Sequence, residues 1–474
     1  MRAAAFFCGE ENIKVSNGIK NNPTTRRGFL GAAAMTAASY NRVLGANDRI
    51  GLGFIGFGLI GKQHVSDFKK LNDVSLVALS ETYKPRLQEG LAYIGNPNAK
   101  GYSDFRKMYE DKNVQAVVVA TPDHWHCLHT VTACAAGKDV YVEKPMTLFI
   151  DEGKWMIQAA RKHNRVVVVG TQRRHGKAVA EARKSVQSGL LGKISLVRRA
   201  EARNIYPGFG KTPVENPPAE LDYDMWLGPA PKRPYQAHRA LYHFRWFWDY
   251  SGGQMANLAA HGIDQMLWVM NVKMPTKVHS SGGRFALEDD GETTDVQEAL
   301  FEFPGFVHSY AIREINGYRG DTATRGLVFH GTKGTMLLSG NYEVLPEMKG
   351  DPVNSIPRFL GHPVGGPQAS ETKPEPWIKA PPAAATGGGE DTMALNKRNW
   401  IDCMRSRQRP LCDVEDGHHV AVACNLANMS VKLGRSIRWD PDKQVVIGDK
   451  EAAALCYRPY REPWDKVLRS IVKV

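Results

Sequence analysis

The stretch LGFIGFGLIGKQH, Leu52–His64, leads an apolar run directly into Gly56, Gly58 and Gly61. A short run of this kind is typical of a strand buried on both faces of a parallel sheet. The following KQHVSDFKKL predicts a helix, and VSLVALS, Val74–Ser80, predicts a second strand. Glycines between a strand and a helix, inside a β-α-β unit of about 30 residues, indicate a dinucleotide-binding turn rather than a plain turn.

Each glycine of this turn has its own expected role. Gly56 permits the tight turn, Gly58 lets the backbone approach a pyrophosphate, and Gly61 lets the helix pack on the strand. The phosphates then lie at the helix N-terminus, where free backbone amides favour negative charge. The predicted cofactor-binding set therefore includes the whole turn: Gly56, Phe57, Gly58, Leu59, Ile60 and Gly61.

The second strand is followed by a carboxylate, Glu81, which lies 20 residues beyond Gly61. A carboxylate at this place holds the hydroxyls of the adenosine ribose, which favours NAD. Lys84 and Arg86 follow closely and could receive a 2′-phosphate, so NADP stays open as an alternative.

The composition is that of an ordinary globular protein of several domains, with 474 residues, 42% hydrophobic and 23% charged. No internal apolar run is long enough to cross a bilayer, so membrane insertion is not expected. The seven cysteines form no CxxC pair. We therefore expect neither a disulfide framework nor a zinc site.

The net charge of +13 does not by itself indicate a nucleic-acid partner. Residues 1–46 hold six basic and two acidic residues, so the rest keeps 56 basic and 47 acidic residues. These charges are interspersed, and no basic stripe with interleaved aromatics occurs. We expect a solvated, mildly basic surface that weakly favours anionic ligands, and no nucleic-acid binding.

Residues 1–46 are predicted to be an export segment rather than part of the fold. TTRRGFLGAAAMTAASY, Thr24–Tyr40, places twin arginines before a short, weakly apolar segment and resembles a twin-arginine export signal. The alternative is a disordered basic tail. The resemblance implies export, to the periplasm or beyond, of a protein that folds and takes up its cofactor first.

The alternation of strands and polar ends continues after the first unit. VQAVVVATPDHWH, KDVYVEKPMT and VVVVGTQRR each read as a buried strand followed by polar residues. In open α/β sheets, ligands bind at the carboxyl ends of the strands. The pattern predicts a dinucleotide-binding domain over residues 47–170.

Together, GFIGFGLIG, ATPDHWH, EKP and WFWDYSGGQMANLAAHGID resemble the Gfo/Idh/MocA family of NAD(P)-dependent oxidoreductases. The resemblance implies an α/β fold: an N-terminal Rossmann parallel sheet, and a C-terminal α/β domain over residues 171–440 with a mostly antiparallel open sheet. It also implies a carbohydrate substrate, namely a sugar, cyclitol or glycoside. A homodimer or homotetramer formed through the C-terminal sheet is expected.

Lys144, in EKP, follows a buried strand beside Glu143. An ammonium there can hydrogen-bond the reacting hydroxyl and stabilise a developing alkoxide. The resemblance assigns Lys144 this catalytic role. The plain alternative is a surface lysine paired with Glu143.

The stretch Gly252–Trp268 predicts one helix that carries Asn257, His261 and Asp264 on one face. Neutral imidazole can take a hydroxyl proton, so His261 is the predicted general base. Many members of the family have Asp where Asn257 stands. Because Asn cannot ionise, Asn257 is expected to hold the substrate or orient His261, and Asp264 is predicted to contact the substrate.

Further candidates come from the loops around the expected cleft. Thr121, Pro122 and His126 match a family loop that lines the nicotinamide, and Glu143 joins the cofactor-binding set. Three histidines in this loop could suggest a metal, but no carboxylate or cysteine set accompanies them, so no metal is predicted. Predicted substrate contacts, in a cleft of stacking aromatics, are Arg173, Trp246 and Trp248, although such aromatics are as often core.

The second domain shows strand-like runs such as ISLVRRAEA and FVHSYAIRE, and two helices are expected after residue 392. Residues 346–390 are predicted to be a long loop, and residues 441–474 an extended tail. The function predicted is hydride transfer between tightly bound NAD(P) and a ring hydroxyl. Two alternatives remain: an NAD-dependent glycosidase acting through transient C3 oxidation, and a dinucleotide-binding sensor without turnover.

Overall fold

The structure is a computed structural model that describes residues 49–349, 375–381 and 390–474. The predicted export segment, residues 1–46, lies outside the described residues, as does most of the loop predicted over 346–390. Among the described residues, no helix is both long and apolar enough to cross a membrane.

The first sheet is built around β1 (Ile50–Ile55), the strand that precedes the glycine turn. All its strand pairs are parallel, and the order is β3-β2-β1-β4-β5-β6. The other strands are β2 (Val74–Ser80), β3 (Lys100–Tyr102), β4 (Ala116–Val119), β5 (Asp139–Val142) and β6 (Val167–Val169). The order reverses between β1 and β4, which is the point where open α/β sheets bind dinucleotides.

Helices cover both faces of this sheet, and each face has its own hydrophobic core. The helices between its strands are α2 (Leu59–Phe68), α3 (Lys84–Ile94), α4 (Phe105–Glu110), α5 (His126–Ala135) and α6 (Ile150–Lys162). Strand β4 is wholly buried, as expected of an all-apolar strand covered on both sides. The Rossmann sheet predicted from the glycine turn is confirmed.

The second sheet has nine strands in the order β13-β12-β11-β7-β10-β9-β8-β16-β17. Only the β7–β10 pair is parallel, so the sheet is mixed and mostly antiparallel, as predicted. Its strands are β7 (Ile194–Ala202), β8 (Lys277–Gly283), β9 (Val296–Phe303), β10 (Phe306–Arg313), β11 (Leu327–Gly331), β12 (Gly334–Leu338), β13 (Tyr342–Pro346), β16 (Ile437–Asp440) and β17 (Val445–Val446). A separate two-stranded ribbon pairs β14 (Met348–Lys349) with β15 (Glu375–Pro376).

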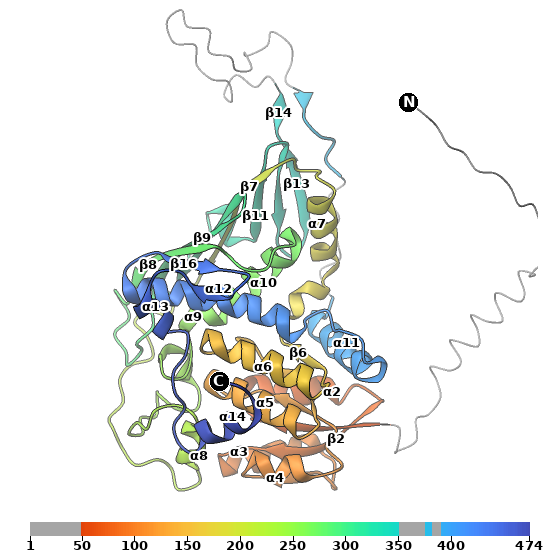
Figure 1. Cartoon of the computed structure of the whole chain (residues 1–474), viewed down its shortest axis with the longest axis vertical. Helices are drawn as coiled ribbons and strands as arrows, with labels where there is room; N and C mark the ends of the chain where they lie inside the picture. Colours follow the sequence, from red (N-terminus) through yellow and green to blue (C-terminus); the bar gives the residue numbers. More distant parts are fainter. Residues whose placement is uncertain (1–48, 350–374, 382–389) are drawn as a thin grey trace, which may run out of the picture. The chain divides into compact units, whose positions relative to one another are not determined.

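One face of the nine-stranded sheet is covered by helices and the other is open. The covering helices are α7 (Lys177–Gln187), α10 (Ala259–Met270) and α12 (Val414–Leu433). Burial alternates along β9 and β10, which is typical of a sheet with one solvated face. Figure 1 shows α12 between this sheet and α6, so the long helix joins the two sheets of the body.

Two parts of the C-terminal region depart from the predicted domain boundaries. Helix α11 (Thr392–Ser406) packs on the Rossmann sheet, where Trp400 contacts the rings of Phe68 and Tyr141 at 5.8 and 5.7 Å. The prediction of an extended tail over residues 441–474 is wrong. That segment contains α13 (Lys450–Ala454) and α14 (Trp464–Ile471), and Trp464 packs 5.0 Å from Trp125 in the core of the first domain.

The described cysteines, six in number, are buried and unpaired. Burial raises the pKa of several of these thiols, Cys412 and Cys424 to about 12. They therefore behave as small apolar side chains in the cores.

Candidate functional site

The glycine turn has the geometry that a bound pyrophosphate requires. Gly56 has a φ of +90°, and a Cβ there would lie 2.8 Å from the carbonyl oxygen of Ala120. A Cβ on Gly61 would lie 2.3 Å from the carbonyl oxygen of Gly56, whereas one on Gly58 would meet nothing within 4 Å. The first and third glycines are thus required by packing, and the second leaves open space at the N-terminus of α2.

The backbone amides at this helix start are available to a ligand. Gly58 is the N-cap of α2, no side chain caps the helix, and its first turn holds no acidic residue. Negative charge of a ligand is stabilised at such an end by the amides and the helix dipole.

Glu81 lies directly after β2 and faces the turn. One carboxylate oxygen accepts a hydrogen bond from the backbone N–H of Phe57 at 2.8 Å, and the other accepts one from Thr82 N–H at 2.8 Å. The carboxylate is therefore fixed beside the turn, where a ribose would lie. Phe57 itself is 3% exposed and contributes its backbone, while its ring packs in the core.

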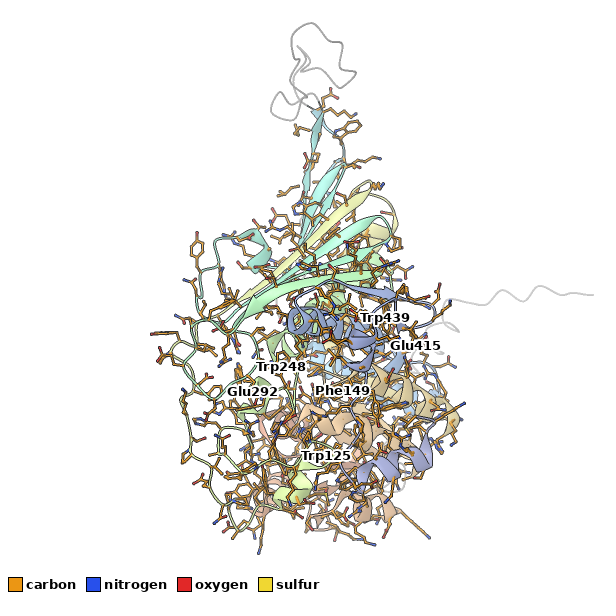
Figure 2. All side chains as sticks on the ribbon, turned by 60° about the vertical axis from the view of Figure 1, so that its left-hand side comes forward. Trp125, Phe149, Trp248, Glu292, Glu415 and Trp439 are labelled. Atoms are coloured by element: carbon orange, nitrogen blue, oxygen red, sulfur yellow. The ribbon has the colours of Figure 1, made fainter. Side chains whose placement is uncertain are left out.

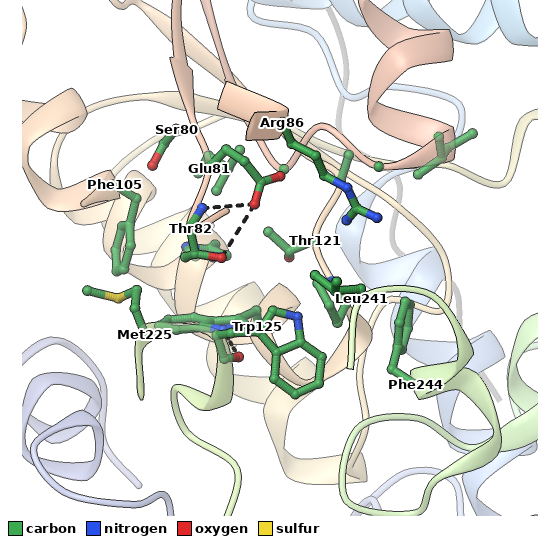
Figure 3. Close-up of a pocket in the computed structure, with 18 of the residues that line it drawn as sticks. Ser80, Glu81, Thr82, Arg86, Phe105, Thr121, Trp125, Met225, Leu241 and Phe244 are labelled. Atoms are coloured by element: carbon green, nitrogen blue, oxygen red, sulfur yellow. Dashed lines mark hydrogen bonds between the residues drawn. The ribbon is translucent and has the colours of Figure 1, made fainter. Parts of the chain in front are cut away.

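A pocket opens between the turn and a segment of the second domain. Its empty volume is about 850 Å³, open solvent included. Figure 3 shows Glu81 and Arg86 on one side of it, with Met225, Leu241 and Phe244 on the other. The predicted residues that line it are Gly56, Gly58, Leu59, Ile60, Glu81, Thr121 and Pro122.

The segment that covers the pocket, residues 220–244, is not predicted from the sequence as part of a cofactor site. It is joined to the chain after β2 by two backbone hydrogen bonds, Lys84 N–H to Glu220 O and Asp222 N–H to Thr82 O, both 3.0 Å. It carries α8 (Tyr223–Leu227) over the pocket. The only sequence signal was the apolar and aromatic run around Phe244, which was interpreted as part of a carbohydrate cleft.

The hydroxyl of Thr121 is buried and has no hydrogen-bond partner among the described residues. Because it lines the pocket, it is free to bond a ligand there. Together with the open space at Gly58 and the fixed Glu81, this orphaned hydroxyl shows that the residues present fit a dinucleotide.

Two predicted cofactor contacts prove to hold the scaffold instead. The ring nitrogens of His126, which is 1% exposed, lie 2.7 Å from Pro145 O and 2.9 Å from Thr121 O. Glu143 is 6% exposed; one of its oxygens lies 2.8 Å from His64 Nε2 and the other accepts the backbone N–H of Lys144 at 3.0 Å. The hydrogen bonds of both side chains are made within the fold, and they fix the chain around Lys144.

Lys144 projects from the end of β5 to the second domain. Its ammonium donates a hydrogen bond of 2.7 Å to Asn257 Oδ1, and Asn257 Nδ2 donates to Gln254 Oε1 at 3.0 Å. Gln254 thereby fixes the amide so that its oxygen faces Lys144. Burial lowers the pKa of Lys144, and the carboxylates Glu143 and Asp123 oppose that effect.

His261 is near this pair, on the first turn of α10. Burial lowers its pKa well below the usual value, and the cations Lys144, Arg173 and Arg199 lower it further. The imidazole is therefore neutral at neutral pH, as a general base must be. Its Nδ1 is buried without a hydrogen-bond partner among the described residues.

The sequence predicts one continuous helix over Gly252–Trp268, but the structure has two. They are α9 (Gly253–Asn257) and α10, which meet at Leu258. Asn257 therefore ends one helix and turns to Lys144, and no hydrogen bond joins it to His261 among the described contacts. Its expected role of orienting His261 is replaced by holding Lys144.

Three predicted substrate contacts lie elsewhere. Asp264 is fully buried and accepts a hydrogen bond of 2.8 Å from Arg174, so it is a structural ion pair. Trp246 is 7% exposed and donates to Glu314 at 3.0 Å, inside the core. Trp248 lies beside Glu292 in Figure 2, and the ammonium of Lys432 covers its ring at 3.8 Å. Asp264 and Trp246 are buried away from a sugar, and the ring of Trp248 is already occupied by Lys432 on one face.

The remaining predicted substrate residue, Arg173, stays near the catalytic groups. It lowers the pKa of both Lys144 and His261 and is largely buried, on the short helical turn Gln172–His175 after β6. The structure thus brings together Lys144, Asn257, His261 and Arg173, on elements from both domains.

Comparison with known proteins identifies the two domains separately. Residues 50–171 match the NAD-binding Rossmann fold of the Gfo/Idh/MocA oxidoreductase family. Residues 175–284 and 391–466 match the C-terminal alpha/beta domain of the same oxidoreductase family. Residues 285–349, which contain β9 to β13, lie outside both matches. The first match shows that the turn belongs to a NAD-binding domain.

Individual relatives are more distant. Myo-inositol 2-dehydrogenase of Thermotoga maritima is 25% identical over 249 residues, which are 52% of this chain and 63% of that protein. The chain therefore spans less than two thirds of the length of this curated relative. It shares a fold with the WlbA dehydrogenase of Bordetella pertussis in complex with NADH and UDP-GlcNAcA (TM-score 0.59, 20% identity, 83% of this chain and 99% of that one). It also shares a fold with levoglucosan dehydrogenase in complex with NADH and levoglucosan (TM-score 0.59, 19% identity, 82% and 99%).

Proposed function

Because the chain belongs to the Gfo/Idh/MocA family of oxidoreductases, we propose that it moves a hydride between tightly bound NAD and a sugar, cyclitol or glycoside. The atom that reacts is a ring carbon bearing a hydroxyl. The observation that carries the proposal is the 2.7 Å hydrogen bond from Lys144 Nζ to Asn257 Oδ1, beside the neutral His261. It joins Lys144 of the first domain to the segment of the second domain that carries His261 four residues later.

Bound NAD supplies a hydride acceptor, and its reduced form a donor. Gly56, Gly58 and Gly61 would hold the pyrophosphate, Glu81 the ribose hydroxyls, and Thr121 the region near the nicotinamide. The chain's own residues then act on the substrate oxygen. His261 takes the hydroxyl proton, while Lys144 donates a hydrogen bond to the same oxygen and stabilises the developing alkoxide.

Tight retention of the cofactor is supported by the covered pocket. The segment with α8 is hydrogen-bonded to the chain after β2 and places Met225, Leu241 and Phe244 over the site. Release of a dinucleotide requires this cover to separate from the turn, which slows dissociation.

The substrate class is supported by what similar proteins act on. The relatives named above act on myo-inositol or are bound to levoglucosan or a sugar nucleotide. All of these are cyclic compounds with ring hydroxyls, and the same class is proposed for this chain.

Export by the twin-arginine route is part of the proposal and rests on Arg26 and Arg27 in residues 1–46. Self-association through the open face of the nine-stranded sheet is a further part, supported by the solvated face of β9 and β10. Fusing residues 1–46 to a reporter that is active only outside the cytoplasm tests the first. Light scattering of the purified protein tests the second.

The catalytic proposal is tested with purified, cofactor-loaded protein and a panel of sugars and cyclitols. Appearance of the absorbance band of reduced nicotinamide is expected with at least one compound. Lys144→Met and His261→Ala are each expected to lower kcat by about 10²- to 10⁴-fold with nucleotide still bound. Lys107→Met is the matched control, since Lys107 is 66% exposed and, in the described part of the chain, forms an ion pair only with Glu110. Full activity in both active-site variants would remove the proposed catalytic pair.

The two alternative functions are separated in the same assay. A glycosidase releases the aglycone of a nitrophenyl glycoside without net change in reduced nicotinamide. A sensor binds NADH, with no sugar changing the absorbance of the bound nucleotide.

A further inference from the structure

A second cavity shares no lining residue with the cofactor pocket. Its empty volume is about 940 Å³, open solvent included. It is bordered by the start of α7, the end of β12 and the side chain of Gln265 on α10. Gln265 follows His261 by one helical turn, so the cavity adjoins the catalytic face of α10.

Most of the charged residues that line the cavity are cations. Its charged lining residues are Arg173, Lys177, Arg199, Arg325 and Glu390. Glu390 is paired with Lys177 at 3.0 Å, and Arg199 is paired with Glu201 at 2.7 Å. Positive charge therefore exceeds negative charge around the cavity even after these pairs are formed.

Arg173 differs from the other cations in its surroundings. It is largely buried, and burial is the main cause that lowers its pKa. Within residues 49–349, 375–381 and 390–474 its guanidinium forms no hydrogen bond or ion pair. The side chain keeps some exposure and its nitrogens are not sealed from solvent, so they are open to a ligand, and a bidentate anion matches the guanidinium fork best.

Arg173 also connects the cavity with the reacting groups. It lines the cavity, and it is close enough to Lys144 and His261 to lower the pKa of both. Arg199 lines the same cavity and likewise lowers the pKa of His261. A ligand with its hydroxyl at Lys144 and His261 therefore extends from the reacting carbon toward two arginines.

The start of α7 adds to this field. Gly176, Lys177 and Ala178 border the cavity, and the helix runs for 11 residues away from it. The N-terminus of such a helix favours negative charge. Glu390 already accepts the backbone N–H of Lys177 at 2.8 Å, so the remaining amides of this helix start only support the arginines and are not by themselves a site.

We propose that the substrate is an acidic sugar, whose carboxylate or phosphate is bound by Arg173 at the mouth of this cavity while its ring hydroxyl lies at Lys144 and His261. This inference rests on the proposed function and adds the substrate class. The reaction is unchanged: the C–H bond gives its hydride to the bound NAD, the hydroxyl proton goes to His261, and the acidic group only binds.

The test compares acidic and neutral sugars of the same configuration. The probes are glucuronate and galacturonate, the 6-phosphates of glucose and galactose, and the two neutral hexoses, all with cofactor-loaded full-length protein. The quantity measured is the ratio of kcat/KM for each acid to that for its neutral hexose. Using a ratio matters because Arg173 also acts on His261, so its removal alters the rate with every substrate.

In Arg173→Gln, this ratio is expected to fall by about 10- to 100-fold for the acid that is used, as expected when a charge-assisted hydrogen bond is lost. Arg173→Lys should keep part of the preference, since a charge remains without the bidentate fork. Arg198→Gln is the matched control. It is the neighbouring residue on β7, points to the opposite face from Arg199, and pairs with Asp321 at 3.1 Å. A fall with uronates identifies a carboxylate, and a fall with hexose phosphates identifies a phosphate.

Calorimetric binding of the same acids separates the two proposals. Binding that is lost in Arg173→Gln but not in Arg198→Gln, with no oxidation of any probe, supports the anion site and contradicts the dehydrogenase. Oxidation of neutral hexoses, with acid-to-neutral ratios equal in wild type and Arg173→Gln, overturns the anion site and leaves the dehydrogenase standing. The anion site is also overturned if the wild type neither binds nor oxidises any of the acids.

Discussion

Alanine at Gly58 and alanine at Gly61 are predicted to have opposite effects, although both glycines belong to the same turn. Gly58 has φ −79° and ψ −161°, an extended conformation that alanine adopts readily, and its Cβ would meet no atom within 4 Å. The folded protein should therefore accept Gly58→Ala. Its unfolding free energy should be unchanged or raised by about 0.4–1 kcal/mol, because alanine reduces the entropy of the unfolded chain.

Gly61→Ala should instead disturb the fold. Its Cβ would lie 2.3 Å from the carbonyl oxygen of Gly56, whereas real Cβ contacts essentially never fall below 3.0 Å, so the helix or the turn must move by 0.7 Å or more. The atom it meets is backbone and cannot rotate away. Overpacking of this kind costs about 1–3 kcal/mol. In a chain of this length, that lowers the thermal midpoint by about 1–3 °C.

Gly58→Ala, the variant that keeps the stability of the fold, should be the one that loses affinity for the cofactor. The new methyl group in Gly58→Ala occupies the open space where the pyrophosphate would approach the start of α2, and a clash of about 1–3 kcal/mol weakens binding about 10- to 100-fold. The assay uses nucleotide-free protein, unfolded by heat with and without added NADH. Binding raises the midpoint of the wild type, while Gly58→Ala should unfold like wild type and gain little from NADH.

Two results would refute this reasoning. One is Gly58→Ala with the NADH affinity of the wild type, which would mean that the pyrophosphate does not approach this point. The other is Gly58→Ala as unstable as Gly61→Ala before NADH is added, which would mean that the open space beside Gly58 does not exist.

Three other perturbations follow from contacts of the site and the cores. Asn257→Asp places a carboxylate 2.7 Å from the Lys144 ammonium, which should raise the pKa of Lys144. The alkaline limb of the pH profile of kcat/KM should then move up by about 1–2 pH units. A pH profile identical to that of the wild type would contradict this expectation. Burial raises the pKa of Asp264 to about 6 despite Arg174, so the folded state holds an extra proton between about pH 4 and 6. Urea unfolding should show the wild type losing stability relative to Asp264→Asn as the pH rises through that window, and parallel curves would argue against it. Trp464→Ala should cost about 3–5 kcal/mol and also weaken NADH binding, measured by calorimetry; unchanged urea stability would show that α14 does not support the first domain.

The elements predicted most accurately are those in which the pattern of apolar residues alone determines which side chains are buried. Strands β2 and β7 begin and end where predicted, because a short apolar or alternating run has one way to bury its face. The conformational roles expected of Gly56 and Gly61 agree with the structure, because Gly56 has a φ of +90° and a Cβ on Gly61 would collide with the carbonyl oxygen of Gly56.

Contacts between distant residues could not be predicted in the same way. Asp264 was expected at the substrate, but its partner Arg174 lies 90 positions away and buries it in an ion pair. An aromatic residue such as Trp246 has the same sequence signature in a cleft and in a core, and only packing decides between them. The helix break at Leu258 also leaves no propensity signal, since both of its sides are helical.

The helices of residues 441–474, where an extended tail is predicted, could have been recognised from the sequence. Trp464, Leu468 and Ile471 recur at helical spacing, and this amphipathic signal was present in the sequence. It was missed because the segment is short and follows a proline-containing stretch.

The helices that complete the first domain have a consequence for synthesis on the ribosome. The strands β1 to β6 leave the exit tunnel early, whereas α11 and α14, which cover one face of that sheet each, are made only after the second domain. Chains grow at about 5–20 residues per second, so the nascent first domain waits many seconds with part of each apolar face uncovered. This half of the chain is therefore the part that most needs a chaperone during translation, and cutting the chain after β6 should give an aggregating fragment rather than a separable nucleotide-binding module.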